Sequence, residues 1–384
     1  MVEQRSGYID NIRLGMIVLV VLVHAAVTYS GIGSWYYKDV GKLSIIETLL
    51  FLFFQSFTQS YFMGLLFLLA GYMVPRALEK KGPGGFLRDR LVRLGGPALF
   101  YMLAINPFIS YFLIGQAKRP FLDYFASYYL GLRFVGGSGP LWFALALLVF
   151  SVIYTVVQRR LILGNKHNQQ RPYGVLDLIG LIVLITVCTF LVRLVQPIDT
   201  SILNMQFCFF SQYIIFFIVG TMAAQERLLD RVDYRLGVRC LQIALVPGII
   251  FWVLMLVIGG AFSLGSVAAF KGGFHWQSLA YAFWESTNGV LISFGLIAVF
   301  RERLNKQNNF IKQMSNASFA VYAFHAPILV AISKIMQPWC TTPLIKFIGV
   351  SVIALIVSFG LAHLILKRIP LFYTVKPPIR LSDK

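Results

Sequence analysis

Acidic residues are scarce in this chain of 384 residues: 15 Asp and Glu stand against 34 Lys and Arg, and only 13% of all residues are charged. At the same time 58% of the residues are hydrophobic. A soluble domain of this length needs far more polar residues to cover its surface. The composition therefore excludes a soluble globular protein and predicts one with many membrane spans.

Cysteine is also rare. The four cysteines, Cys188, Cys208, Cys240 and Cys340, show no paired spacing. Three of them fall in or beside apolar runs of membrane-spanning length. A disulfide framework or a cysteine metal site requires closely spaced pairs. We therefore expect neither disulfides nor a bound metal.

The net charge of +19 does not indicate a nucleic-acid-binding protein. The basic residues fall in short loops between apolar runs, which is the topology signal of a membrane protein. The first apolar run is not a cleaved signal peptide, because it is long, contains His24 and is followed by many further runs. With no internal repeat and no separate soluble segment, we expect one domain over residues 1–384, with its core at about 8–370.

The apolar runs predict an all-α integral membrane protein, a bundle of about ten transmembrane helices. The predicted spans are 11–31, 45–73, 95–114, 139–157, 175–195, 205–223, 240–260, 279–300, 317–336 and 344–366. On this count, 25 of the 34 Lys and Arg fall in the termini and in alternate connections. Basic loops stay in the cytoplasm, so both termini are predicted to be cytoplasmic.

The first span contains two ionisable residues that a membrane helix normally avoids. Arg13 lies at its entry, and His24 follows after ten intervening residues. On a helix the two are ~16 Å apart, so Arg13 can lie at the cytoplasmic face while His24 is more than halfway across a core ~30 Å thick. A histidine at this depth is a candidate functional residue.

Other spans carry polar side chains at comparable predicted depth: Gln59, Trp142, Glu285, Asn288 and His325. Buried polar groups in a membrane need partners, so we expect one polar cavity in the outer half of the bundle. The alternative for each residue is a hydrogen bond that only joins neighbouring helices, or, for Glu285, a solvated position at the interface.

A cytoplasmic run before the third span contains Arg90 and Arg93. If the run is helical, their spacing of three places them on one face, where a guanidinium pair can bind phosphate oxygens. The alternative is ordinary anchoring of the chain by positive charge.

These motifs resemble the membrane-bound acyltransferase family 3, over nearly the whole chain. The most specific element is the arginine and histidine of the first span, Arg13 and His24. Further elements are FMGLLFLLAGY (62–72), Arg90 with Arg93, PLWF (140–143), WES (284–286) and SNASFAVYAFHAPIL (315–329). Together with the terminal KRIPLF (367–372), they are most similar to the branch of periplasmic glucan succinyltransferases.

The resemblance implies transfer of an acetyl or succinyl group from cytoplasmic acyl-CoA, as co-substrate, to a hydroxyl of a carbohydrate-type acceptor at the outer face of a bacterial cytoplasmic membrane. It assigns the essential histidine to His24, its partner to Arg13, a second histidine to His325, and the CoA phosphate contacts to Arg90 and Arg93. Pro140 departs from the branch, which has a histidine there.

Span four also lacks an acidic residue found in many relatives, so that role is either missing here or moves to Glu285. Histidine suits a general base for a hydroxyl, and a nucleophilic histidine is the alternative. Trp142 or His325 could then stabilise the oxyanion, with Asn288 and Gln59 nearby. No residue pattern predicts an oligomeric state.

The competing class is a proton-coupled transporter or flippase of a polar or carbohydrate-like solute, since buried histidines and a glutamate also suit a carrier. Against it, the sequence shows no internal repeat and predicts no paired broken helices, and a carrier has no need of an arginine pair placed for a nucleotide.

Overall fold

The computed structural model of the protein describes residues 7–115, 120–161, 173–225, 227–262, 267–364 and 368–369. Within these ranges the chain is helical, apart from short connections and an isolated bridge between Ile202 and Met205. The predicted all-α class is confirmed. Several predicted loop charges, including Lys166, Arg171 and most of the KRIPLF stretch, lie outside the described residues.

Nine helical runs in the described part of the chain are long and apolar enough to cross a membrane. They are Gly7–Ser30, Ile45–Leu113, Gly139–Gln158, Val175–Arg193, Phe207–Ala224, Tyr234–Ile258, Trp276–Arg303, Asn309–Ile335 and Pro343–Leu364. The run Ile45–Leu113 contains two of the ten predicted spans, so the two counts describe the same set of segments.

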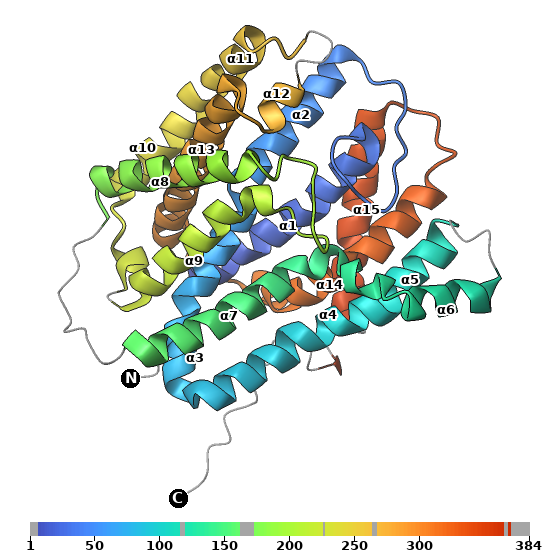
Figure 1. The fold of residues 1–384 in the computed structure, drawn as a ribbon, viewed down its shortest axis with the longest axis horizontal. Coiled ribbons are helices and arrows are strands. Elements are labelled where there is room, and N and C mark those ends of the chain that lie inside the picture. Colours follow the sequence, from blue (N-terminus) through green and yellow to red (C-terminus); the bar gives the residue numbers. More distant parts are fainter. Residues whose placement is uncertain are drawn as a thin grey trace, which may run out of the picture.

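That long run folds back on itself. It comprises α2 (Ile45–Gln59) and α3 (Phe62–Arg90), and continues through the π-helical turn η1 (Leu91–Gly95) into α4 (Gly96–Phe100), η2 (Tyr101–Ile105), α5 (Asn106–Phe108) and η3 (Ile109–Leu113). The reversal occurs at Gly82, whose φ of +66° a residue without a Cβ adopts readily. Figure 1 shows the second limb running back beside α7. The predicted loop between spans two and three is therefore helical.

The remaining elements follow in chain order: α1 (Gly7–Ser30), α6 (Phe121–Leu130), η4 (Arg133–Gly136), η5 (Gly139–Leu141), α7 (Trp142–Leu161), α8 (Val175–Arg193), η6 (Phe207–Phe209), α9 (Phe210–Gln225), η7 (Leu228–Arg231), α10 (Tyr234–Leu245), α11 (Pro247–Ile258), α12 (Ala268–Lys271), α13 (Trp276–Arg303), α14 (Asn309–Ile335) and α15 (Pro343–Leu364).

Pro247 divides one span into α10 and α11, and Ser60–Tyr61 divides α2 from α3. The predicted spans 45–73 and 240–260 are thus each built of two helices.

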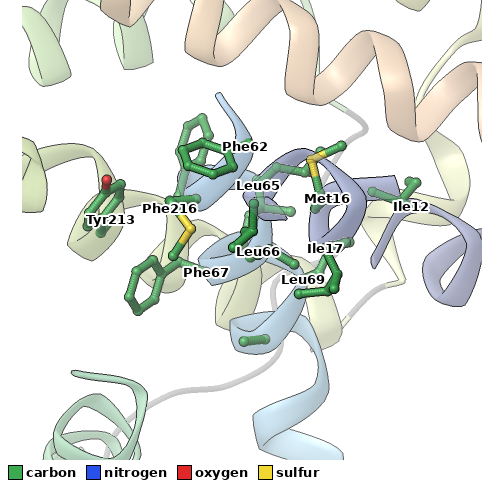
Figure 2. Close-up of a cluster of buried hydrophobic side chains, with 14 of the residues drawn as sticks. Ile12, Met16, Ile17, Phe62, Leu65, Leu66, Phe67, Leu69, Tyr213 and Phe216 are labelled. Atoms are coloured by element: carbon green, nitrogen blue, oxygen red, sulfur yellow. The ribbon is translucent and has the colours of Figure 1, made fainter. Parts of the chain in front are cut away.

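Helix α1 lies at the centre of the bundle (Figure 1) and packs against α2, α3, α13, α14 and α15. One apolar side of α1 meets α3 and α9 in a buried cluster that includes Ile12, Met16, Phe67 and Phe216 (Figure 2). A helix surrounded in this way can hold a polar side chain such as His24 away from lipid.

The connections gather at two opposite ends of the bundle. At one end, which we call the basic end, the hydroxyls of Tyr8 and Tyr72 both donate to the carboxylate of Asp230, at 2.7 and 3.1 Å. Arg301 donates to the Asp230 carbonyl. At the other end, the loop after α1 is bonded to the start of α15 by Lys346 and Asp39, 2.8 Å apart. Within the described residues, the start of α1, the connection around Asp230 and the end of α13 therefore share the basic end.

Helices α3 and α9 cross at very close range because each contributes a glycine. A Cβ at Gly71 would lie 2.2 Å from the carbonyl oxygen of Phe217, and one at Gly220 would lie 2.1 Å from that of Leu68. Small residues at such crossings let membrane helices pack by van der Waals contact, which is the main attraction available in lipid.

Alanine at Gly71 or Gly220 should therefore destabilise the fold by about 1–3 kcal/mol, because backbone must move to admit the methyl group. Gly180 is the matched control, since a Cβ there meets nothing within 4 Å. Thermal unfolding of the purified protein in detergent measures the effect. G71A and G220A midpoints at or above that of G180A would contradict the tight crossing.

Candidate functional site

The two buried histidines predicted from the sequence meet in the structure. Nδ1 of His24 on α1 lies 3.1 Å from Nε2 of His325 on α14, and the two rings stack with centroids 5.1 Å apart. His325 has no exposed surface, whereas His24 is half-buried. His24 is thus the accessible member of the pair, and His325 lies behind it.

The hydrogen bonds of the pair fix its proton positions. Nδ1 of His325 lies 2.8 Å from the carbonyl oxygen of Tyr322. A carbonyl only accepts, so Nδ1 of His325 carries the proton and its Nε2 is an acceptor in the neutral ring. His24 must then donate from Nδ1, which leaves a lone pair on His24 Nε2. His24 Nε2 is therefore the basic atom of the site.

Trp35 covers one face of His24. The two rings are stacked, with centroids 3.9 Å apart and planes inclined by 22°. The Trp35 ring is also nearly parallel to that of His325, with the planes inclined by 11° and the centroids 6.0 Å apart. Its indole Nε1 is buried and has no hydrogen-bond partner. Trp35 was not among the residues predicted from the sequence, because nothing in a loop sequence shows that the loop folds back into the bundle.

Trp35 belongs to a segment of residues 31–44 between α1 and α2, which we call the strap. Its turn away from α1 uses Gly31 and Gly33, with φ of +73° and +93°. The strap then runs back beside α1, as the bond from the Asp39 amide to the Thr28 carbonyl, at 2.9 Å, shows. His24 is six residues before the end of α1, or ~9 Å along its axis, so the strap returns to the depth of the histidine.

Glu285 lies in an ion pair, neither beside His24 nor solvated at the interface as the two alternatives had it. Its Oε2 lies 2.5 Å from Nη2 of Arg193, and both side chains are buried, with Arg193 wholly inaccessible. The guanidinium also lies over the rings of Phe209 and Tyr281, at 5.4 Å from each centroid. Arg193 lies near the end of the predicted span 175–195. The structure places Glu285 in a buried ion pair that joins α8 to α13.

Gln59 and Trp142 lie in a second group, around Tyr213 of α9. Gln59 Nε2 donates to the Tyr213 hydroxyl at 3.0 Å. The Trp142 ring stacks on Tyr213 at 5.8 Å and contacts Phe67 and Phe210. These two predicted site residues therefore pack in an aromatic cluster around Tyr213.

Asn288 has a local role in α13. Its Nδ2 donates to the Trp284 carbonyl one turn earlier, at 2.8 Å, and Trp284 donates from its indole to the Gly248 carbonyl. The predicted single cavity is thus divided: the histidines form one polar centre, and Glu285, Asn288 and Gln59 each have partners elsewhere.

Arg13 and Arg90 approach each other at the basic end, where each guanidinium opposes the charge of the other. Arg90 packs over the Phe86 ring at 5.0 Å, and its buried Nε has no partner. Arg93 is exposed and bound to Asp89 at 3.0 Å. Arg93, which lies in the π-helical turn η1, also opposes the charge of Arg90, so Arg13 joins the predicted pair of Arg90 and Arg93 at this end.

In the described part of the chain, no group of three or more His, Cys, Asp or Glu side chains could hold a metal ion.

The chain was compared with models of known protein families. The family model described as an acyltransferase domain matches residues 6–363. No curated protein and no solved structure matches.

Breaking the Arg193–Glu285 pair should be costly. E285Q leaves a buried guanidinium without a counter-ion, and loss of one partner of such a pair typically costs about 3–5 kcal/mol. The double variant R193Q/E285Q removes both charges and should recover most of that loss. Thermal unfolding in detergent tests this; a stable E285Q, or a double variant less stable than both single ones, would contradict the buried pair.

Proposed function

Because the chain belongs to the acyltransferase 3 family, whose model spans nearly its whole length, we propose that this membrane acyltransferase moves an acetyl or succinyl group from acyl-CoA to a hydroxyl of a carbohydrate-type acceptor. The basic end would face the cytoplasm and the strap the outer side of a bacterial inner membrane, as the positive-inside rule predicts. The choice of acceptor follows from the resemblance to the glucan succinyltransferase branch.

The observation that carries this proposal is the free lone pair on His24 Nε2, set by the chain of bonds from the Tyr322 carbonyl through His325. A sugar hydroxyl is a poor nucleophile unless a base removes its proton as it attacks. His24 accepts that proton at Nε2. Its Nδ1–H remains bonded to His325, which keeps the ring in the required orientation and supports the imidazolium that forms.

The bonds formed and broken in the proposed acyl transfer balance. The acceptor oxygen adds to the thioester carbonyl carbon while its proton passes to His24. The tetrahedral intermediate collapses, the carbon–sulfur bond breaks, and the thiolate of CoA leaves. His24 returns its proton to this sulfur, so an ester and free CoA are the products and the histidine is regenerated.

Arg13 and Arg90 are the proposed site for the CoA phosphates. Two guanidinium groups that repel each other, one with a buried unpartnered N–H, suit a bound polyanion. Arg13 and His24 lie on one helix ~16 Å apart along its axis, so the pantetheine arm would run beside α1 from the phosphates to the histidine.

Replacing His24 with Asn should lower acyl transfer by about 10²–10⁴-fold, the usual contribution of a general base, and leave insertion and thermal stability unchanged. Transfer of labelled acetyl or succinyl from its CoA ester to soluble glucans, in proteoliposomes, measures this. His275, exposed at the start of α13, is the control in H275N. Full turnover by H24N would overturn the assignment, and uptake of a solute without acyl transfer would favour the carrier.

The phosphate site predicts a difference between donors. R90Q should raise the KM for acyl-CoA by about 10–100-fold, the value of one or two charge-assisted hydrogen bonds. The same variant should handle acyl-pantetheine, which lacks the phosphates, as the wild type does. R303Q at the same end is the control, since Arg303 is bonded to Tyr234. An equal KM change for both donors would place the phosphates elsewhere.

A further inference from the structure

The histidine pair supplies a base but leaves the developing negative charge without a donor. Addition to a thioester moves charge onto the carbonyl oxygen, and an enzyme stabilises it with fixed N–H groups. Both nitrogens of His325 are already engaged, with the Tyr322 carbonyl and with His24. Trp142, the other donor expected from the sequence, packs against Phe67, Phe210 and Tyr213.

Trp35 offers a donor next to the base. Its Nε1 is buried without a partner, and leaving a buried N–H unpaired typically costs about 1–3 kcal/mol. Such groups are rare in folded proteins and call for an explanation, a catalytic role among them. The ring centroids of Trp35 and His24 are 3.9 Å apart in a stack. The N–H of the indole and the Nε2 lone pair of the imidazole therefore lie in adjacent, nearly parallel planes.

The strap holds this donor in place without help from a ligand. Tyr36, the next residue, packs edge-on against Trp35 at 5.2 Å and donates to Asn106 Oδ1 at 2.7 Å. The Tyr101 hydroxyl donates to that of Tyr36 at 3.1 Å. A donor fixed before the substrate arrives needs no reorganisation during the reaction, which is what makes an oxyanion site effective.

We propose that the indole N–H of Trp35 donates to the carbonyl oxygen of the acyl group and stabilises the oxyanion formed when the acceptor hydroxyl, activated by His24, adds to the thioester. This rests on the proposed acyl transfer. Trp35 would then be a catalytic residue supplied by the strap, and each half of the stacked pair would serve one oxygen of the tetrahedral intermediate.

The test replaces Trp35 with β-(3-benzothienyl)alanine, which keeps the size and the stacking surface of tryptophan and has sulfur in place of the N–H. Loss of one oxyanion donor should lower kcat by about 10²–10³-fold, with the KM for acyl-CoA within about threefold of the wild type. The same replacement at Trp252, in the separate core cluster around α11, should leave kcat unchanged.

The pH profile separates this role from a structural one. If Trp35 only holds the His24 ring, the benzothienyl variant keeps its kcat, because the stack is intact, and W35A shifts the midpoint of the kcat–pH profile. If the N–H binds the oxyanion, kcat falls in the benzothienyl variant while that midpoint and the unfolding temperature stay at the wild-type values. A kcat within threefold of the wild type would overturn the proposal even if H24N is inactive, whereas a wild type without acyl transfer would remove the proposed function itself.

Discussion

The hydrogen bond between His24 and His325 joins the central helix α1 to α14 and sets the chemistry of both rings. The Tyr322 carbonyl determines which ring donates in this bond. A carbonyl can only accept, so Nδ1 of His325 donates to it, and Nδ1 of His24 donates to Nε2 of His325. A helix carbonyl therefore determines which nitrogen of a residue on another helix is basic. The packing of α1 against α14 is part of the same constraint, because a shift along either helix would break the bond.

As the proposed base, His24 differs from the histidine of a serine-protease triad in the group that orients it. In the triad a carboxylate stabilises the imidazolium; here a neutral imidazole backed by a carbonyl would do so. Glu285, the acidic side chain predicted for the site, is paired with Arg193 at 2.5 Å instead. A neutral support stabilises a positive His24 less than a carboxylate would. In the proposed acyl transfer the proton would therefore pass readily from His24 to the leaving sulfur, and a strong donor to the oxyanion would become more important.

Most of the fold could be predicted from the sequence, because long apolar runs reveal membrane helices directly. The depth of His24 and of His325 also followed from their distance along the predicted spans, and the structure brings them to 3.1 Å. Depth alone does not give the rotation of a helix about its axis. That is why Glu285 and Gln59, placed at a similar level, were expected beside His24 but have Arg193 and Tyr213 as partners.

Two further features had no signal in hydropathy. The π-helical turn η1, which begins directly after Arg90, depends on hydrogen bonds that no residue pattern encodes. The strap looks like an ordinary outer loop of glycine, aromatic and charged residues, yet its two left-handed glycines return Trp35 to the histidine. In the strap, local backbone geometry, rather than side-chain polarity, decides which residue reaches His24.

Helix α1 also limits how the two substrates can meet. Arg13 and His24 are fixed on one continuous helix, so the separation of the proposed phosphate site from the base cannot change without breaking α1. In the proposed function, the acyl donor would therefore reach His24 from the basic end. The proposed acceptor would come from the other end, where the strap, tied to α15 through Asp39 and Lys346, covers one face of the same ring. The strap would then border the path of the acceptor, so we expect its sequence, rather than that of α1, to influence acceptor specificity.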